Sequence, residues 1–313
     1  MAEIMLISII IPVYNSEKTI RTIVSDLHKE FSPKYQHEII LINDDSLDDS
    51  GKICLELHRE FKENIVYLEL SRNFGEHNAV MAGLNLAKGD WIIIMDDDLQ
   101  NPATEAVRLA DFAQNSNFDV VYTRYEYKHH NLWRNLGSKF NDKVANIMLN
   151  KPAGLYLSSF KIISSRIAKE IIQYKLPYPY IDGIILGITR HIGSFTVQHK
   201  ERKEGKSGYT LGKLLHLWSN MFTNFSIIPL RIAVVSGFIF SALGFILGIL
   251  TIIEKMLKPE IPLGYASLFV AMSFFSGMVL IALGMLGEYI GRIFLSLNKK
   301  PQYVIKEKYD KDS

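Results

Sequence analysis

Three consecutive carboxylates, Asp96, Asp97 and Asp98, follow an apolar run and are the residues whose type and spacing first suggest chemistry. Hard divalent cations prefer oxygen ligands, so Asp96 and Asp98 are candidate ligands of Mg²⁺ or Mn²⁺. Such an ion would bridge a diphosphate and neutralise the charge on a leaving phosphate. The alternative is an acidic turn that caps the following helix.

Two other polar clusters also follow apolar runs, at Tyr14-Asn15 and at Asn43-Asp44-Asp45-Ser46. In the second cluster, Asp44, Asp45 and Ser46 have the groups needed to hydrogen-bond a base or a ribose. The alternative is an Asx turn at the start of a helix. The pattern favours nucleotide contact, and both roles are compatible.

A basic segment over residues 200–206 (KERKEGK) precedes Ser207 and is the third candidate binding feature. Arg202 and Lys206 are able to close over a diphosphate, with Gly205 and Gly208 supplying mobility. A solvated loop is the alternative interpretation of the same composition.

These candidates need a scaffold, and the first part of the chain predicts one by alternating short apolar runs with amphipathic stretches. The predicted strands cover residues 6–13, 38–42, 65–70, 91–95 and 119–122, and the predicted helices 17–31, 48–61, 78–87 and 102–113. Such alternation indicates an α/β fold with a mostly parallel sheet covered on both faces. The polar clusters would then share the edge where the strands end, where such sheets bind ligands. The chain contains neither a GxGxxG nor a GxxxxGK[ST] motif, which weakens Rossmann-cofactor and P-loop interpretations.

Two long uncharged runs dominate the last third of the chain. Ile232–Ile253 contains 22 residues and Ile261–Gly287 contains 27, and about 20 apolar residues suffice for a helix to cross a bilayer. Basic residues flank the hairpin on the side of both termini, so the positive-inside rule predicts cytoplasmic termini. Small residues in both runs also allow self-association of the chain.

The expected organisation has five parts. They are a cytoplasmic domain over residues 1–210, an amphipathic interfacial helix over 211–226, transmembrane helices over 227–255 and 261–287, and a cytoplasmic basic tail over 288–313. The single cysteine, Cys54, excludes an intramolecular disulfide framework. A net charge of +2 gives no case for nucleic-acid binding.

Several of these segments, in order, match a known pattern. Ile11–Asn15 is similar to an opening strand motif, Asn43–Ser46 to a DDGS turn, Asp96–Pro102 to a DADLQ-x-P metal motif, and Leu286–Ile293 to the segment that leaves a second membrane helix. The chain therefore resembles the family 2 glycosyltransferases with a GT-A (Rossmann-like) fold. More narrowly, it resembles the polyprenyl-phosphate glycosyltransferases of bacterial membranes, which are similar to dolichol-phosphate-mannose synthase.

This resemblance implies roles for individual residues. Pro12, Tyr14, Asn15, Asp44, Ser46 and Asp97 would contact the nucleotide, Asp96, Asp98 and Gln100 would be catalytic, and Arg202, Lys206 and Ser207 would hold the diphosphate. Arg124 and Arg134 are candidates for the acceptor phosphate. The implied partners are a nucleotide sugar, a polyprenyl phosphate and the lipid bilayer.

One departure from the pattern concerns the base. In the glucosyl branch an Asp precedes Phe-Arg in a later strand, and here Ser159 stands before Phe160-Lys161. An acceptor phosphate is already largely ionised at pH 7, so it needs positioning more than deprotonation. Residues 76–79 (EHNA) together with Ser159 favour the aminoarabinose-type branch over the glucosyl one.

The sequence thus predicts metal-dependent, inverting transfer of a sugar, from a UDP-sugar by the resemblance, to undecaprenyl phosphate. The enzyme would be a two-pass protein of the inner (plasma) membrane, with its catalytic domain and both termini in the cytoplasm, and would make a lipid-linked sugar for the cell envelope. A processive polysaccharide synthase is one alternative, but no Q-x-x-R-W motif precedes any of the three tryptophans. A non-catalytic membrane adaptor with a degenerate transferase domain is the other.

Overall fold

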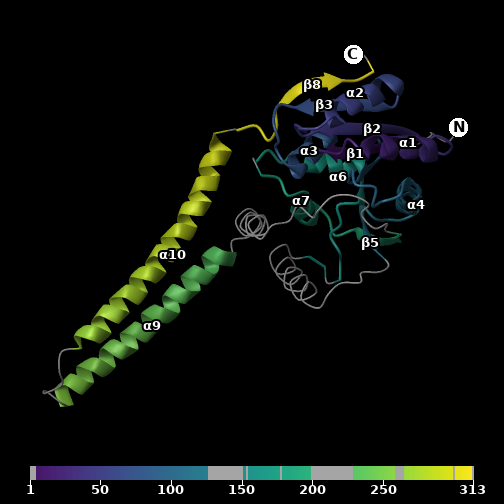
Figure 1. Ribbon diagram of the computed structural model, residues 1–313. Helices are drawn as coiled ribbons and strands as arrows, with labels where there is room; N and C mark the ends of the chain where they lie inside the picture. The colour runs from purple at the N-terminus through teal and green to yellow at the C-terminus, as the bar shows by residue number, and fades with distance from the viewer. Residues whose placement is uncertain are drawn as a thin grey trace. The chain divides into compact units, whose positions relative to one another are not determined.

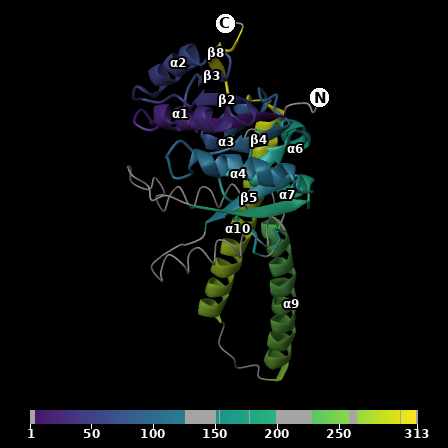
Figure 2. The same cartoon turned by 90° about the vertical axis from the view of Figure 1, so that its right-hand side faces the viewer.

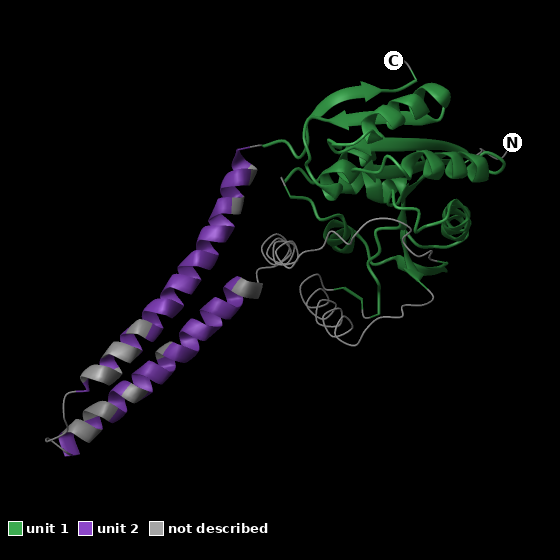
Figure 3. Ribbon diagram, viewed as in Figure 1, with its two compact units in different colours: residues 1–209, 300–313 green, residues 210–299 purple. Residues whose placement is uncertain are grey.

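The chain divides into two compact units, shown in Figure 3. Unit 1 comprises residues 1–209 and 300–313, and unit 2 comprises residues 210–299. The computed structural model describes residues 5–125, 151–152, 154–176, 178–198, 228–257, 264–298 and 300–311. Arg134, the expected diphosphate-binding residues Arg202, Lys206 and Ser207, and the expected interfacial helix over 211–226 lie outside these described residues.

Unit 1 is built on a mixed, mostly parallel sheet. Its described strands run in the order β7-β5-β6-β4-β1-β2-β3-β8. They are β1 (Leu6–Val13), β2 (Gln36–Asn43), β3 (Ile65–Leu70), β4 (Trp91–Ile94), β5 (Val120–Tyr125), β6 (Lys161–Ser164), β7 (Ile192–Val197) and β8 (Ile305–Tyr309). The pairs β1–β2, β1–β4, β2–β3 and β5–β7 are parallel. Strand β6 runs antiparallel to β4 and β5, and β8 runs antiparallel to β3.

Helices cover both faces of this sheet, as Figure 1 and Figure 2 show. On one face α1 (Ile20–Phe31), α2 (Ser50–Glu60) and α4 (Ala103–Gln114) share a core with the alternate strand residues Ile7, Ile9 and Ile11. On the other face α3 (Glu76–Leu84) comes so close that a Cβ on Gly83 would meet the Ile10 side chain at 2.7 Å. This double cover explains why β1 is apolar throughout instead of alternating.

The described part after β5 adds two short helices, α6 (Ser165–Ile171) and α7 (Ile181–Ile188). Ser164 caps α6, its hydroxyl accepting the Ile167 N–H. The elements expected before residue 122 are all present, with ends that differ by at most three residues. Helix α1 starts at Ile20 instead of residue 17, because residues 17–19 form the turn that leaves the β1 loop.

Unit 2 contains two long apolar helices, α9 (Ile228–Leu257) and α10 (Tyr265–Leu297). Each includes a stretch long and apolar enough to cross a membrane, over Leu230–Leu250 and Phe274–Leu295, and neither stretch is buried inside the protein. Phe238 is 75% exposed, for example. So large an apolar surface calls for a lipid environment instead of water.

The end of the chain differs from a uniform basic tail over 288–313. Helix α10 continues to Leu297, because residues 288–297 have only two charged side chains, Glu288 and Arg292, at a spacing of four residues. After a short connection, Ile305–Tyr309 form β8 at the edge of the sheet of unit 1. The last described strand of the unit 1 sheet therefore follows the apolar hairpin in sequence.

Candidate active site

The loop after β4 is bound directly to the loop after β1 by Asp97. Its Oδ2 accepts the Tyr14 N–H at 3.1 Å and also a hydrogen bond from the Ser16 hydroxyl. The Asp97 carbonyl oxygen accepts the Thr19 hydroxyl at 2.6 Å. Burial raises the pKa of Asp97 to about 6, against the lowering effect of these hydrogen bonds. Asp97 thus positions the two loops relative to each other.

Asn15 binds the β1 loop in turn to the loop after β2. Its side-chain oxygen accepts the Leu47 N–H at 2.8 Å, and its own N–H donates to the Ser46 hydroxyl at 3.1 Å. Asn15, Asp45 and Leu99 have φ values of +56°, +58° and +61°, which are uncommon for residues other than glycine. One such residue lies in each strand-end loop, and strained backbone of this kind clusters at functional sites. The three predicted polar clusters therefore meet at one edge of the sheet.

Asp44 is buried and is used by the protein itself. Its two carboxylate oxygens accept the N–H groups of Phe74 at 2.7 Å and Gly75 at 2.8 Å. Burial raises the pKa of Asp44 against the lowering effect of these bonds. Asp44 thereby holds the backbone that enters α3, and its expected nucleotide contact stays a prediction. Nearby Tyr14 is 47% exposed, and Pro12 is half-buried within β1.

The Asp96 carboxylate, a candidate metal ligand, lies among other ionisable groups. Burial, together with the charges of Glu76 and Asp98, raises its pKa to about 6, and a hydrogen bond from the Ser159 hydroxyl at 2.6 Å opposes this rise. The Asp98 carboxylate accepts the Gln100 backbone N–H at 3.1 Å. The negative charges of Glu76 and Asp98 repel that of Asp96, and a bound cation would relieve this repulsion.

The oxygen donors at this edge fit a divalent ion of the Mg²⁺ type. Such ions are commonly held by one or two carboxylates, with substrate phosphates and water as the other ligands. Asp96 and Asp98 supply two carboxylates. No group of three or more His, Cys, Asp or Glu side chains poised for a metal occurs in the described part of the chain, so the remaining ligands would come from substrate and water.

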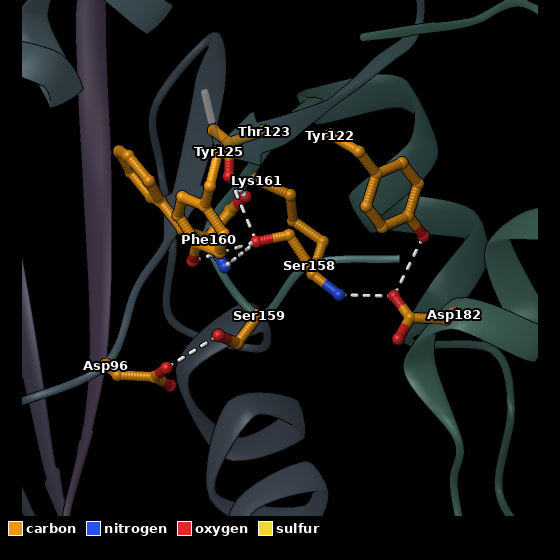
Figure 4. A network of polar contacts seen from close by, with 9 residues as sticks. All are labelled: Asp96, Tyr122, Thr123, Tyr125, Ser158, Ser159, Phe160, Lys161 and Asp182. Atoms are coloured by element: carbon orange, nitrogen blue, oxygen red, sulfur yellow. Dashed lines mark hydrogen bonds and ion pairs between the residues drawn. The ribbon is translucent and has the colours of Figure 1, made fainter. Parts of the chain in front are cut away.

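A buried polar network lies beside Asp96 (Figure 4). Lys161 on β6 forms an ion pair with Asp182 on α7, and Asp182 also accepts the Tyr122 hydroxyl at 2.8 Å. The side chains of Lys161 and Asp182 are only 4% and 11% exposed. One residue before Phe160, Ser159 points away from this pair and toward Asp96. Ser159, which stands where the glucosyl branch has an aspartate, is thus hydrogen-bonded to the acidic loop.

The first turn of α3 brings two more ionisable groups to this region. Burial raises the pKa of Glu76, helped by the charges of Asp182 and Asp97 and opposed by Lys161. Burial lowers the pKa of His77 to about 4, so its imidazole is neutral at pH 7. The His77 ring packs edge-on against Tyr180 with ring centroids 5.2 Å apart.

The structure thus brings together most of the site residues predicted within its described part. Arg124 is an exposed residue of β5, and its acceptor contact stays a prediction. Sequence reasoning missed Glu76, Lys161 and Asp182 as members of this region. Asp182 carried the strongest signal, as the single charge in the apolar helix IDGIILGI.

Comparison with known families agrees with this geometry. Residues 8–172 match the family described as "Glycosyl transferase family 2", and residues 228–293 match the "GtrB C-terminal hairpin". This chain has a mostly parallel sheet, with an acidic loop where the strand β4 ends. This arrangement is that of the GT-A fold. The chain belongs to the family 2 glycosyltransferases, and the predicted polyprenyl-phosphate branch and GT-A fold are confirmed.

Curated relatives match along almost the whole chain. The undecaprenyl-phosphate 4-deoxy-4-formamido-L-arabinose transferase of Photorhabdus laumondii is 32% identical over 316 residues, covering 97% of this chain and 94% of the relative. The protein of the same name from Proteus mirabilis is 32% identical and covers 96% and 93%. Mannosyl-3-phosphoglycerate synthase from Rubrobacter xylanophilus shares the fold, with a TM-score of 0.51 at 14% identity, covering 69% of this chain and 71% of the other. The chain is therefore a glycosyltransferase.

Proposed function

We propose that this glycosyltransferase transfers a sugar from a nucleotide diphosphate donor, a UDP-sugar, to undecaprenyl phosphate with inversion at the anomeric carbon. The proposal places it in the inner membrane, with the catalytic unit and both termini in the cytoplasm. The names of the full-length relatives support the acceptor, and they make UDP-4-deoxy-4-formamido-L-arabinose the first donor to test.

One observation carries the proposal. The N-terminal end of β8, which follows the apolar hairpin, lies beside Leu70 at the carboxyl end of β3, and the Ser71 N–H donates to the Val304 carbonyl at 2.9 Å. The chain therefore returns from its apolar helices on the side of the sheet where the parallel strands end, which is also the side of Asp96 and Asp98. A transfer from a water-soluble donor to a lipid acceptor would need its active site on this side, where the chain connects to the apolar helices.

The residues at this edge suit displacement by an acceptor phosphate. A phosphate oxygen of the lipid attacks the anomeric carbon, the bond from that carbon to the nucleoside diphosphate breaks, and the diphosphate leaves. The acceptor is already ionised at pH 7, so Ser159 in place of a carboxylate does not prevent the step. Asp97 and Asn15 keep the three loops in register, which supplies positioning.

A divalent cation, Mg²⁺ or Mn²⁺, would be held by Asp96 and Asp98 and would stabilise the charge of the departing diphosphate. Ser159 would orient Asp96 through its hydrogen bond. Burial and the neighbouring carboxylates keep the pKa of Asp96 at about 6, so Asp96 is mostly ionised and ready to bind metal at pH 7.

A donor screen tests this proposal. Purified protein in nanodiscs with undecaprenyl phosphate is given radiolabelled UDP-sugars, with and without Mn²⁺, and the lipid extract is counted. We expect labelled lipid with wild type and the matched surface variant Asp26→Ala, and a loss of at least 100-fold with Asp98→Ala. Calorimetry with UDP and Mn²⁺ accompanies it. Wild type that binds both but labels no lipid with any donor would contradict the proposal, and binding unchanged by Asp98→Ala would favour a non-catalytic adaptor.

A further inference from the structure

An exposed apolar loop precedes α7 in unit 1. Leu176 and Tyr178 are 45% and 44% exposed, and the neighbouring Lys175 is exposed as well. Outside α9 and α10, eight large apolar side chains of the described residues are exposed, and four of them lie in two short segments. These four are Leu176, Tyr178, Val304 and Ile305. Large apolar side chains gathered at one place on a surface mark a contact site.

Gln302 joins these two segments. Its side-chain nitrogen donates to the carbonyl oxygens of Tyr174 at 2.9 Å and Leu176 at 2.7 Å, across more than 120 residues of sequence. Both amide hydrogens are thereby used to hold one loop. The loop is consequently fixed to the segment that connects α10 with β8.

The covalent chain limits how far this loop can be from the end of the apolar helix. Gln302 comes five residues after Leu297, the last residue of α10. An extended chain spans at most about 3.6 Å per residue, so the tether is at most about 18 Å long. The polar layer of a bilayer adds roughly 5–8 Å beyond the hydrocarbon on each side. A membrane-embedded α10 therefore keeps Gln302 within about 18 Å of the helix end, a distance from which its loop is able to reach that layer.

We propose that Leu176, Tyr178, Val304 and Ile305 form a membrane-docking surface that sits in the headgroup layer. Tyrosine and leucine side chains suit this layer, because it accepts an apolar body and a polar tip together. Lys175 and Lys300 lie in the same two segments, where they suit anionic lipid phosphates. The inference rests on the proposed insertion of the hairpin. Docking here would set the catalytic edge at the height of the acceptor phosphate.

A depth measurement tests this surface in the full chain. The buried Cys54 is replaced by Ala, and single spin labels are attached at Leu176→Cys, at Asn117→Cys as an exposed control, and at Leu243→Cys within α9. Asn117 lies just before the start of β5, away from the docking surface. In nanodiscs containing anionic lipid, we measure collision of each label with oxygen and with a water-soluble nickel chelate. We expect the oxygen-to-nickel ratio to be at least threefold higher at residue 176 than at 117, and highest at 243.

Each other outcome overturns the inference in a distinguishable way. Equal ratios at 176 and 117, with a high ratio at 243, would show that the hairpin is inserted but the loop is in water. Protection of the 176 label from both reagents would show contact with protein, such as a second copy of the chain. A low ratio at 243 would overturn the proposed membrane insertion as well.

An activity comparison gives a second readout. We expect Leu176→Glu to raise KM for undecaprenyl phosphate in nanodiscs at least fivefold, because a charge opposes docking. With a short-chain, water-soluble polyprenyl phosphate in detergent, kcat and KM should stay within twofold of wild type. Gln302→Ala should act in the same direction by releasing the loop. An equal loss with both acceptors would show a merely structural role, and no loss with either would contradict docking.

Discussion

Asp96, Asp97 and Asp98 are adjacent in sequence, but each has different hydrogen-bond partners. Asp97 accepts bonds from the β1 loop, Asp96 accepts one from Ser159, and Asp98 accepts one from the Gln100 backbone. Asp97 therefore joins the two loops, and Asp96 and Asp98 are the carboxylates that we propose for a cation.

The Ser159 hydroxyl should tune the metal affinity of Asp96. Ser159→Ala removes a hydrogen bond to an ionised group, typically worth about 1.5–3 kcal/mol, and raises the pKa of Asp96 further. We expect Mn²⁺ affinity, measured by calorimetry with UDP present, to fall about tenfold at pH 6.5 and less at pH 8. Ser158→Ala is the matched control, because the Ser158 hydroxyl bonds to Thr123 and not to Asp96. A loss that is equal in both variants would contradict this role.

The raised pKa values of Asp96 and Asp97, both about 6, predict how stability depends on pH in the absence of metal. Both groups bind a proton more tightly in the folded than in the unfolded chain, where an aspartate titrates near pH 3.9. Their protonation therefore favours folding below about pH 4, and this contribution is lost as pH rises through 6.

We expect the melting temperature of the metal-free protein in detergent to respond accordingly between pH 4.5 and 7. Relative to wild type, Asp96→Asn should gain stability as pH rises, by on the order of 1 kcal/mol. Added Mn²⁺ should stabilise wild type more at pH 7 than at pH 5. A pH-independent difference between the two proteins would show that Asp96 titrates normally.

At the scale of the element, strand β8 covers the edge of strand β3. It shields the edge of β3 through an antiparallel pairing, a stacked Tyr67–Tyr309 ring pair with centroids 5.6 Å apart, and an ion pair between Lys306 and Glu69 at 2.6 Å. An uncovered edge strand has free N–H and C=O groups that recruit other strands. Lysines on the new outer edge discourage such pairing.

Deletion of residues 304–313 should therefore destabilise the catalytic unit. We expect a melting temperature at least about 5 °C lower and concentration-dependent aggregation in detergent, followed by light scattering. Deletion of residues 310–313 is the control, because it leaves β8 intact through Tyr309. Identical behaviour of the two truncations would mean that the edge of β3 needs no cover.

Elements with a strong local pattern were predictable, and those that depend on distant partners were not. The run LISIIIPV of β1 and the spaced apolar residues of α1 identify themselves. The run IKEKY of β8 has three charges in five residues, so it resembles a solvated tail until β3 is known to lie beside it. The ends of the predicted strands likewise located Asp96 and Asp98. The charges of Glu76 and Lys161, which act on Asp96, come from elements distant in sequence, so no local pattern indicated their place in the site.

At the scale of the whole molecule, the chain leaves unit 1 for the hairpin and then returns to it. Unit 1 is therefore discontinuous in sequence, because residues 300–313 belong to it together with residues 1–209. Because β8 pairs with β3, both ends of the hairpin must lie on the same side of any membrane that the hairpin enters. This conclusion depends on the pairing alone and agrees with the distribution of basic residues.

Tags at the two termini should therefore have the same accessibility. With epitope tags before Met1 and after Ser313, we expect protease to remove both from inside-out vesicles and neither from intact spheroplasts. A periplasmic reporter supplies the control for spheroplast integrity. Opposite accessibility of the two tags would be incompatible with pairing of β3 and β8.

The position of β8 also has a consequence for biogenesis. The ribosome makes the five strands from β1 to β5 long before it makes residues 305–309, and both apolar helices are translated in between. The edge of β3 consequently stays open until the hairpin has been synthesised. If α10 failed to enter the membrane in the right direction, β8 would be delivered to the wrong compartment. With the hairpin in a membrane as proposed, the sheet is completed only when insertion has the right direction, and a wrongly inserted chain keeps the edge of β3 uncovered.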